Sequence, residues 1–142
     1  MCLTNFTFYS SIEIGISGRP RFLDLHNIYG WQSITYLPKQ RQIRMSWTLP
    51  AGGHIQADLP PVVTLEFRGV SRFAASPHDI QMPYDEDTCL EAVTFTPQEH
   101  ASEKSGFKVF RSDSGHVSFV FRSGFGLQIW AEEAELIYGR DA

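Results

Sequence analysis

Apolar and polar residues alternate most regularly between residues 62 and 70, and this stretch predicts the central strand of the protein. In an extended chain, the odd positions from Val63 to Phe67 are apolar and share one face, whereas Glu66 and the other even positions are polar. This period of two predicts a strand that is buried on one face and exposed on the other. Pro60-Pro61 keeps a helix from entering the stretch, because proline lacks an N–H, and Gly69 allows a turn after it.

Shorter stretches with the same alternation predict most of the remaining strands. A polar turn at residues 38–41 separates two of them, which predicts a hairpin between residues 31–37 and 42–49. The turn residues Asp113-Ser114-Gly115 predict a second hairpin between two further strands. The further expected strands are at residues 3–16 (one bent strand or two short ones), 22–26 (an edge strand), 90–96, 107–111, 117–121 and 125–131 with an extension to residue 138.

Three stretches lack this alternation and are expected to be loops. Residues 50–61 are rich in glycine and proline, and residues 97–105 are polar. Residues 71–88 are the least regular; at about 18 residues they exceed the usual loop length, and such loops are often functional or disordered. A single helical turn is expected within residues 85–89, because acidic side chains suit a helix N-terminus.

The succession of short strands and turns predicts an all-β fold. We expect an antiparallel two-layer sandwich or a partly open barrel of about 8 to 10 strands, with at most one short helical turn. The length of 142 residues fits a single domain, residues 1–142. Residues 22–138 are expected to form its core, and the N-terminal strands of residues 1–20 are expected at its periphery.

The charge distribution argues against one class of partner. The chain has a formal net charge of -4, and its acidic excess lies in residues 51–142, since basic residues outnumber acidic ones in residues 1–50. Nucleic-acid binding requires clustered Lys and Arg, so we expect no nucleic-acid partner. The acidic part either keeps the surface solvated or faces a basic partner.

The termini and cysteines bear on the compartment. Cys2 and Cys89 have no metal-ligand spacing, and so few cysteines favour a reducing compartment. Cys2 is expected at a frayed end of the chain. The N-terminus has no signal-peptide pattern, and no apolar run approaches the length of about 18 residues that a membrane span needs. We therefore expect a cytoplasmic protein that does not enter a membrane.

The histidines do not form a metal-binding motif. Asp24 and His26 project from one face of a strand and could share a metal or a proton, although a surface histidine beside a turn explains the same pattern. No other spacing resembles a metal site, so no cofactor is expected. The five histidines are His26, His54, His78, His100 and His116.

An acidic run shares the long loop with a histidine. Asp85, Glu86 and Asp87 follow His78 within residues 76–88. Clustered carboxylates can bind a hard cation or act as general acid and base, but three consecutive acids in a loop point in different directions. A solvated loop is the simplest explanation. The functional alternative that we retain is contact with a basic site on a protein partner.

Cys89, two tryptophans and a glycine-rich turn are further candidates for functional positions. Cys89 could be a nucleophile beside a histidine, but its place at the start of a strand favours a buried structural residue. Trp47 shares the apolar face of its strand and is expected in the core, whereas Trp130 is out of phase with the apolar positions and is expected to be exposed, as at an interface. Residues 124–126 suit a hairpin turn better than a phosphate-binding loop.

Four short segments of the chain carry a resemblance to known proteins: Leu25-His26, residues 65–70, Phe119-Val120-Phe121 and residues 127–131. Together they resemble a group of small bacterial all-β domains, some of which are grouped with immunity proteins of polymorphic toxin systems. The resemblance covers roughly residues 22–137. This chain has His26-Asn27 where the group usually has a His-Asp step, and no catalytic residue is carried over. The resemblance implies a cytoplasmic bacterial binding protein rather than an enzyme.

Three functional hypotheses follow from these observations. The first is a non-catalytic protein-binding domain of the immunity type that neutralises a basic toxin through Asp85, Glu86, Asp87, His78 and Trp130. The second is a small-molecule or carbohydrate-binding β-domain that uses its aromatic residues. The third is a hydrolase-like enzyme built around Asp24, His26 or His78. A homodimer is compatible with all three.

Overall fold

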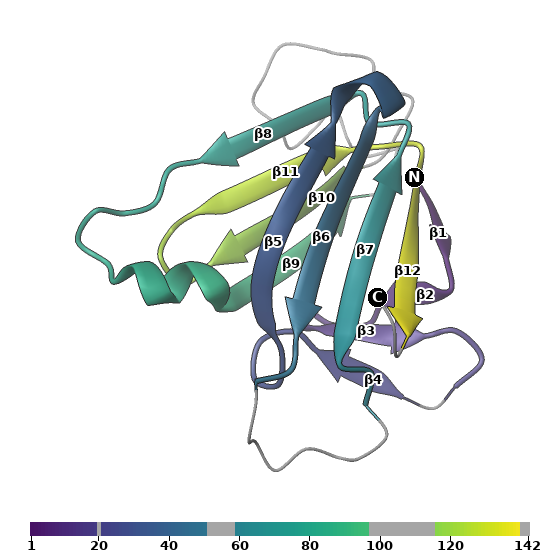
Figure 1. Ribbon diagram of the computed structural model, residues 1–142, viewed down its shortest axis with the longest axis horizontal. Helices are drawn as coiled ribbons and strands as arrows, with labels where there is room; N and C mark the ends of the chain where they lie inside the picture. The colour runs from purple at the N-terminus through teal and green to yellow at the C-terminus, as the bar shows by residue number, and fades with distance from the viewer. Residues whose placement is uncertain (20, 51–58, 97–115, 140–142) are drawn as a thin grey trace.

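The computed structural model describes residues 1–19, 21–50, 59–96 and 116–139, which form three β-sheets (Figure 1). The largest sheet has the strand order β1-β12-β7-β6-β5. Its neighbours are antiparallel except β1, which runs parallel to β12. Its strands are β1 (Cys2–Thr4), β12 (Glu133–Gly139), β7 (Val62–Arg68), β6 (Gln42–Thr48) and β5 (Gly30–Leu37).

A four-stranded antiparallel sheet and a three-stranded sheet complete the fold. The four-stranded sheet has the order β8-β11-β10-β9, and the small sheet has the order β2-β3-β4. Two 3-10 helices, η1 (Pro38–Gln40) and η2 (Tyr84–Thr88), lie between strands. The strands are β8 (Arg72–Ser76), β11 (Gly126–Trp130), β10 (His116–Phe121), β9 (Leu90–Thr96), β2 (Phe6–Phe8), β3 (Glu13–Ile16) and β4 (Phe22–Asp24).

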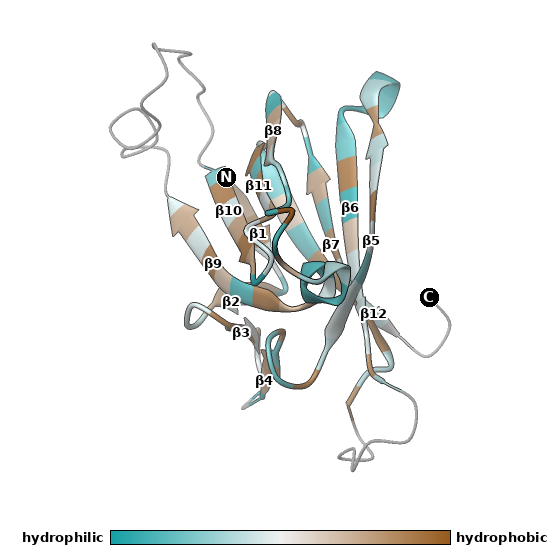
Figure 2. Ribbon diagram, turned by 90° about the vertical axis from the view of Figure 1, so that its left-hand side faces the viewer, coloured by the Kyte–Doolittle hydropathy of each residue, from teal (hydrophilic) through white to brown (hydrophobic). Residues whose placement is uncertain are grey.

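The two larger sheets pack face to face, and polar and apolar residues alternate along their strands (Figure 2). Phe119 of β10 lies between the layers, with its ring centroid 5.9 Å from that of Trp47 and 6.2 Å from that of Phe67. All three side chains are fully buried. The predicted all-β fold is confirmed, and none of the three sheets described here closes into a barrel.

β7 is the middle strand of the five-stranded sheet, as its alternation predicts. The side chains from Val63 to Phe67 on its inner face are fully buried. The expectation that the opposite face is exposed is wrong, because Glu66 is only 4% exposed. β6 and β12 flank β7 on both sides, and the long side chains of Arg44 and Arg68 reach Glu66 from β6 and β7.

The predicted hairpin of residues 31–37 and 42–49 is confirmed as β5 and β6. Its turn contains η1 and Arg41, whose positive φ of 51° closes the connection. Trp47 lies in the core, as expected. β4 forms an edge of the small sheet, also as expected.

Other expectations need correction. Residues 71–88 were expected to be irregular, yet they contain β8. Residues 125–138 hold two strands in different sheets, β11 and β12, rather than one extended strand. Residues 3–16 contribute to three strands, β1 to β3, instead of one or two. The described residues contain twelve strands and two 3-10 helices in all, against the expected 8 to 10 strands and at most one helical turn. The expected strand at residues 107–111, its turn, the connection at residues 97–105 and most of the loop at residues 50–61 lie outside the described residues.

The N-terminal strands belong to the core rather than to its periphery. Phe6, Ile14 and Ile16 are buried in the same apolar cluster as β7 and β10. Cys2 is not at a frayed end, because its N–H donates to the carbonyl oxygen of Glu132 at 2.8 Å. Within the described parts of the chain, neither helix is long and apolar enough to cross a membrane.

Candidate functional site

The segment between β8 and β9, residues 77–89, is the most distinctive surface feature outside the sheets. Pro83 precedes η2 in an extended conformation, and the acids Asp85, Glu86 and Asp87 occupy the first turn. The hydroxyl of Thr88 donates to the carbonyl oxygen of Asp85 at 2.8 Å. This confirms the helical turn expected within residues 85–89, displaced by one residue.

His78 and Asp87 tie this segment together. The Nδ1 of His78 lies 2.6 Å from Oδ1 of Asp87, and its Nε2 lies 2.9 Å from the carbonyl oxygen of Met82. A carboxylate and a carbonyl can only accept, so the doubly protonated imidazolium satisfies both contacts. The Asp87 carboxylate raises the pKa of His78. Burial alone would raise the pKa of Asp87, but hydrogen bonds from Ser123 and His78 lower it below its usual value.

Two further contacts fix the segment to the turn between β10 and β11. The carboxylate of Glu86 pairs with the guanidinium of Arg122 at 3.3 Å, and the N–H of Asp79 donates to the carbonyl oxygen of Ser123 at 2.8 Å. Gly124 has a φ of +83°, a conformation that suits glycine in a tight turn. The prediction that residues 124–126 belong to a hairpin turn is confirmed.

The acidic run is therefore only partly available to a partner. Asp87 and Glu86 make internal contacts with His78 and Arg122. Asp85 is exposed and pairs with no cation in the described part of the chain. The sequence singled out all three acids as a contact surface, but the structure leaves mainly Asp85 facing solvent.

Apolar side chains are exposed beside these acids, which sequence reasoning missed. Ile80 is 88% exposed and Tyr84 is 73% exposed. The ring of Tyr84 stacks on His78, with centroids 4.2 Å apart and planes 5° from parallel. Ile80 lies between Asp79, whose N–H donates to Ser123, and Met82, whose N–H donates to Asp79. These backbone hydrogen bonds hold the exposed Ile80 side chain in place at the surface.

β5 borders this segment and is an edge strand of the five-stranded sheet as far as the described residues show. η2 lies beside β5 (Figure 1). Backbone hydrogen bonds from Gly30–Leu37 to other described residues reach only β6. Tyr36 of β5 is half exposed, and its ring approaches that of Phe73 in β8 at 6.0 Å. Backbone donors and acceptors on the outer side of β5 therefore bond to no other described residue, as in a strand that can pair with a further strand.

His26 and Cys89 meet where η2 joins β9. The Sγ of Cys89 lies 3.7 Å from Nδ1 of His26, which also contacts the carbonyl oxygen of Leu90. Cys89 is partly exposed, so the expectation of a buried structural cysteine is wrong. Asp24 does not contact the His26 ring; its carboxylate accepts the backbone N–H groups of His26 and Asn27 at 2.9 and 2.7 Å.

No family model, curated protein or solved structure matches this chain. Its function is therefore inferred from the geometry of its own residues.

Trp130 is not part of an exposed surface. It lies on the outer face of the four-stranded sheet, as its phase predicts, but it is only 3% exposed. Its ring stacks on His116 at 4.8 Å, and the guanidinium of Arg72 lies 4.6 Å from the ring centroid. The expectation of an exposed binding residue is wrong, because neighbouring side chains cover this position.

Among the described histidines, His26 and His78 both contact residues 87–90. His26 contacts Cys89, and His78 contacts Asp87. In the described ranges, no group of three or more His, Cys, Asp and Glu side chains could hold a metal ion. His54 and His100 lie outside those ranges.

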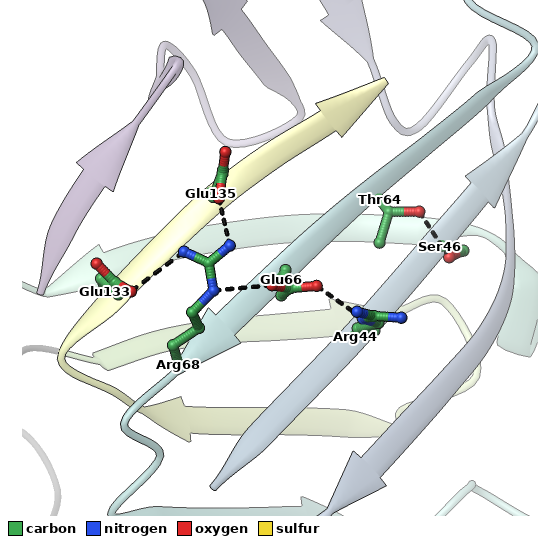
Figure 3. A network of polar contacts seen from close by, with 7 residues as sticks. All are labelled: Arg44, Ser46, Thr64, Glu66, Arg68, Glu133 and Glu135. Atoms are coloured by element: carbon green, nitrogen blue, oxygen red, sulfur yellow. Dashed lines mark hydrogen bonds and ion pairs between the residues drawn. The ribbon is translucent and has the colours of Figure 1, made fainter. Parts of the chain in front are cut away.

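A network of charged side chains lies on the outer face of the five-stranded sheet (Figure 3). Glu66 accepts hydrogen bonds from Arg44 at 2.7 Å and from Arg68 at 2.8 Å. Arg68 also pairs with Glu133 at 3.2 Å and with Glu135. Every charge in this cluster has an opposite charge beside it, so we assign it a structural role.

Proposed function

We propose that the chain is a non-catalytic protein-binding domain whose docking surface combines the outer edge of β5 with the exposed side chains of residues 77–89. The observation that carries the proposal is their adjacency. An edge strand whose outer backbone groups bond to no described residue lies beside a segment that presents Ile80 and Tyr84 to solvent.

The composition of β5 supports pairing with a partner strand. Natural proteins protect exposed edges with charged residues, proline or bulges. β5 reads Gly-Trp-Gln-Ser-Ile-Thr-Tyr-Leu, without charge or proline, and its single irregularity lies between Trp31 and Ser33. An extended peptide that adds to such an edge gains main-chain hydrogen bonds along its length.

The neighbouring side chains favour a partner with both apolar and basic residues. Ile80 and Tyr84 are the kind of exposed side chain that anchors an interface. Asp79 and Asp85 are exposed beside them and form no ion pair with the described residues. We infer an extended segment of a basic protein as the occupant. Neutralisation of a basic toxin by a cytoplasmic immunity-type protein is the specific form of this proposal.

Affinity capture from lysate of the source cells, with variants in parallel, tests the proposal. Ser33→Lys places a charge on the β5 edge, and Ile80→Ser removes the apolar anchor. Each is expected to weaken capture of one stoichiometric partner by about tenfold. Ile80→Ser removes an anchor residue, and Ser33→Lys opposes pairing of a partner strand with the edge. Ile137→Ser is the control, because Ile137 is exposed on the outer face of the sheet, in β12. Equal capture by all four proteins would place the docking surface elsewhere.

One observation favours small-molecule binding as a second candidate. Trp31 and Trp47 are cross-strand neighbours, and the indole N–H of each is buried without an acceptor among the described residues. A buried donor without an acceptor is costly, and a ligand oxygen would satisfy it. Native mass spectrometry of the purified protein separates the candidates, because this candidate requires a co-purified small molecule in place of a protein partner.

A further inference from the structure

His78 closes a short loop that carries Ile80. Nε2 of His78 lies 2.9 Å from the carbonyl oxygen of Met82, and the N–H of Met82 donates to the carbonyl oxygen of Asp79 at 2.9 Å. Ile80 lies between these contacts and is 88% exposed. The imidazole ring therefore spans the base of residues 78–82, and Ile80 projects from the loop that the ring closes.

The same ring supports the second exposed side chain of the docking surface. Tyr84 stacks on His78 with centroids 4.2 Å apart and planes 5° from parallel. A cation beside the face of an aromatic ring is attracted to it, so a protonated His78 strengthens this contact. The His78 side chain itself is only 11% exposed. Ile80 and Tyr84 therefore both depend on the position of one largely buried imidazole.

Both ring nitrogens of His78 face atoms that can only accept a hydrogen bond. Nδ1 lies 2.6 Å from Oδ1 of Asp87, and Nε2 faces the carbonyl oxygen of Met82. A neutral imidazole has a single N–H, so one nitrogen would direct a lone pair at an acceptor. The carboxylate forms the stronger, charge-assisted hydrogen bond and retains the N–H. Deprotonation of His78 therefore removes the contact with Met82 that closes the loop.

The charged groups around His78 favour its protonated form. The hydrogen bond to Asp87 of η2 raises the pKa of His78, burial lowers it, and the nearby charge of Asp79 raises it further, with a net upward shift. Arg122, in the adjoining turn between β10 and β11, pairs with Glu86 of η2 at 3.3 Å, so an acid opposes its charge. The ring is therefore protonated below the ordinary histidine pKa and loses its proton only above it.

We propose that His78 is a pH-operated switch for the docking surface: its protonated ring holds Ile80 and Tyr84 in place, and its deprotonation opens residues 78–82 and releases both side chains. Deprotonation passes one proton to solvent and breaks no covalent bond. The use of these side chains for docking rests on the proposed function, whereas the switch itself is a property of the isolated chain.

NMR of the isolated protein at a series of pH values tests the switch without a partner. Above the midpoint of His78, we expect the Overhauser contacts between the His78 and Tyr84 rings to disappear. The backbone order parameter of Ile80 should fall from about 0.85, typical of a rigid backbone, to below about 0.6. Ile137 is the matched control, because it is also exposed but lies in β12, and its order should not change. An Ile80 backbone that stays ordered above the midpoint would overturn the proposal.

Two variants separate this switch from histidine titration in general. Asp87→Asn removes the charge that faces Nδ1, so the midpoint of His78 and the loss of order at Ile80 should move together to lower pH. His26→Gln is the matched control, since His26 contacts Leu90 and lies outside the 78–82 loop, and it should leave the transition where it is. A loss of order at an unchanged pH in Asp87→Asn would contradict His78 as its cause.

Affinity capture from lysate at two pH values extends the test to the docking surface. Below the midpoint, capture should be at least about fivefold stronger than above it, as for other coupled equilibria, and His78→Gln should lose this dependence. Equal capture at both pH values would overturn control of docking by the switch, while the proposed function stands. If no partner is captured at either pH, the proposed function fails and the NMR transition alone decides on the switch.

Discussion

Glu66 keeps its charge in a buried position because Arg44 and Arg68 donate to its two carboxylate oxygens. Burial alone would raise the pKa of Glu66, but these hydrogen bonds outweigh burial and lower the pKa below its ordinary value. Arg68 is held in turn by Glu135, Glu133 and Glu66, which raise its pKa. Removing one partner would leave the other charges incompletely paired, so the cluster acts as a unit.

The ion pair of His78 and Asp87 makes the order of residues 77–89 depend on pH. Its contribution through His78 is present below the ordinary histidine pKa and is lost as the pH rises through the raised pKa of the folded protein. Its contribution through Asp87 is present above the ordinary aspartate pKa and is lost as the pH falls through the lowered folded value. We expect an NMR titration of His78 to have its midpoint above the ordinary histidine pKa of 6.5.

Loss of the His78–Asp87 ion pair should also loosen the backbone of residues 77–89. Above the His78 midpoint, amide hydrogen exchange in residues 77–89, corrected for the intrinsic effect of pH, is expected to quicken relative to β7. His78→Gln should remove this step, because glutamine does not titrate and cannot form the ion pair. A midpoint at or below 6.5, or an unchanged pH response in His78→Gln, would contradict the assignment.

Among the elements, long and regular alternations were predictable and short or shifted ones were not. β5, β6 and β7 begin and end within two residues of the predicted positions, although only β6 alternates in burial. The boundary between β11 and β12 was missed, although a signal exists. The apolar positions are odd through Ala131 and even from Ala134 onward, and such a change of phase indicates that the strand has ended. β8 was missed because two of its residues are alanines, which carry little strand signal.

Sequence reasoning named several residues of the candidate site but not their partners. His78, Glu86 and Asp87 were identified as candidates. Their engagement depends on the turn between β10 and β11, which only the assembled sheet brings beside residues 77–89. The contact of His26 with Cys89 was also unpredictable, because it forms only when the turn after β4 comes beside the residue before β9. The exposure of Trp130 was wrong because alternation gives the face of a sheet and not what covers that face.

Gly69 allows the chain to leave one sheet and enter the other. It follows β7 with a φ of +64°, and an added Cβ would lie 2.5 Å from the carboxylate of Glu132. We expect Gly69→Ala to cost the roughly 1–2 kcal/mol of left-handed strain plus a smaller excess for moving the exposed Glu132 side chain aside. Gly18→Ala is the control, since Gly18 also has a positive φ but has no atom within 4 Å of its added Cβ.

Denaturant unfolding measures both costs, and a double variant separates their causes. The Glu132 side chain is exposed, so Glu132→Ala should remove the excess cost of Gly69→Ala and leave only the backbone strain. A Gly69→Ala protein as stable as the unmodified chain would show that this turn does not require glycine.

At the scale of the whole molecule, the N-terminal segment joins the sheets to one another. β1 extends the five-stranded sheet beside β12. The ring of Phe8 stacks on Phe95 of β9 at 5.7 Å, and the N–H of Val93 donates to the carbonyl oxygen of Ser11 at 2.6 Å. The same segment therefore contacts both layers, which predicts that it unfolds together with them.

Phe6 tests this cooperativity. Its side chain is fully buried in the common core, so Phe6→Ala is expected to lower the free energy of unfolding by about 3–5 kcal/mol. Tyr9→Ala is the matched control in the same segment, because Tyr9 is 62% exposed and its loss should cost less than about 1 kcal/mol. Urea unfolding followed by tryptophan fluorescence should show one transition in each protein. The three tryptophans lie in β5, β6 and β11, outside the N-terminal segment, so they report on a loss at Phe6 only if the segment and the sandwich unfold as one unit. An unchanged midpoint in Phe6→Ala would instead mean that the N-terminal strands detach before the two sheets separate.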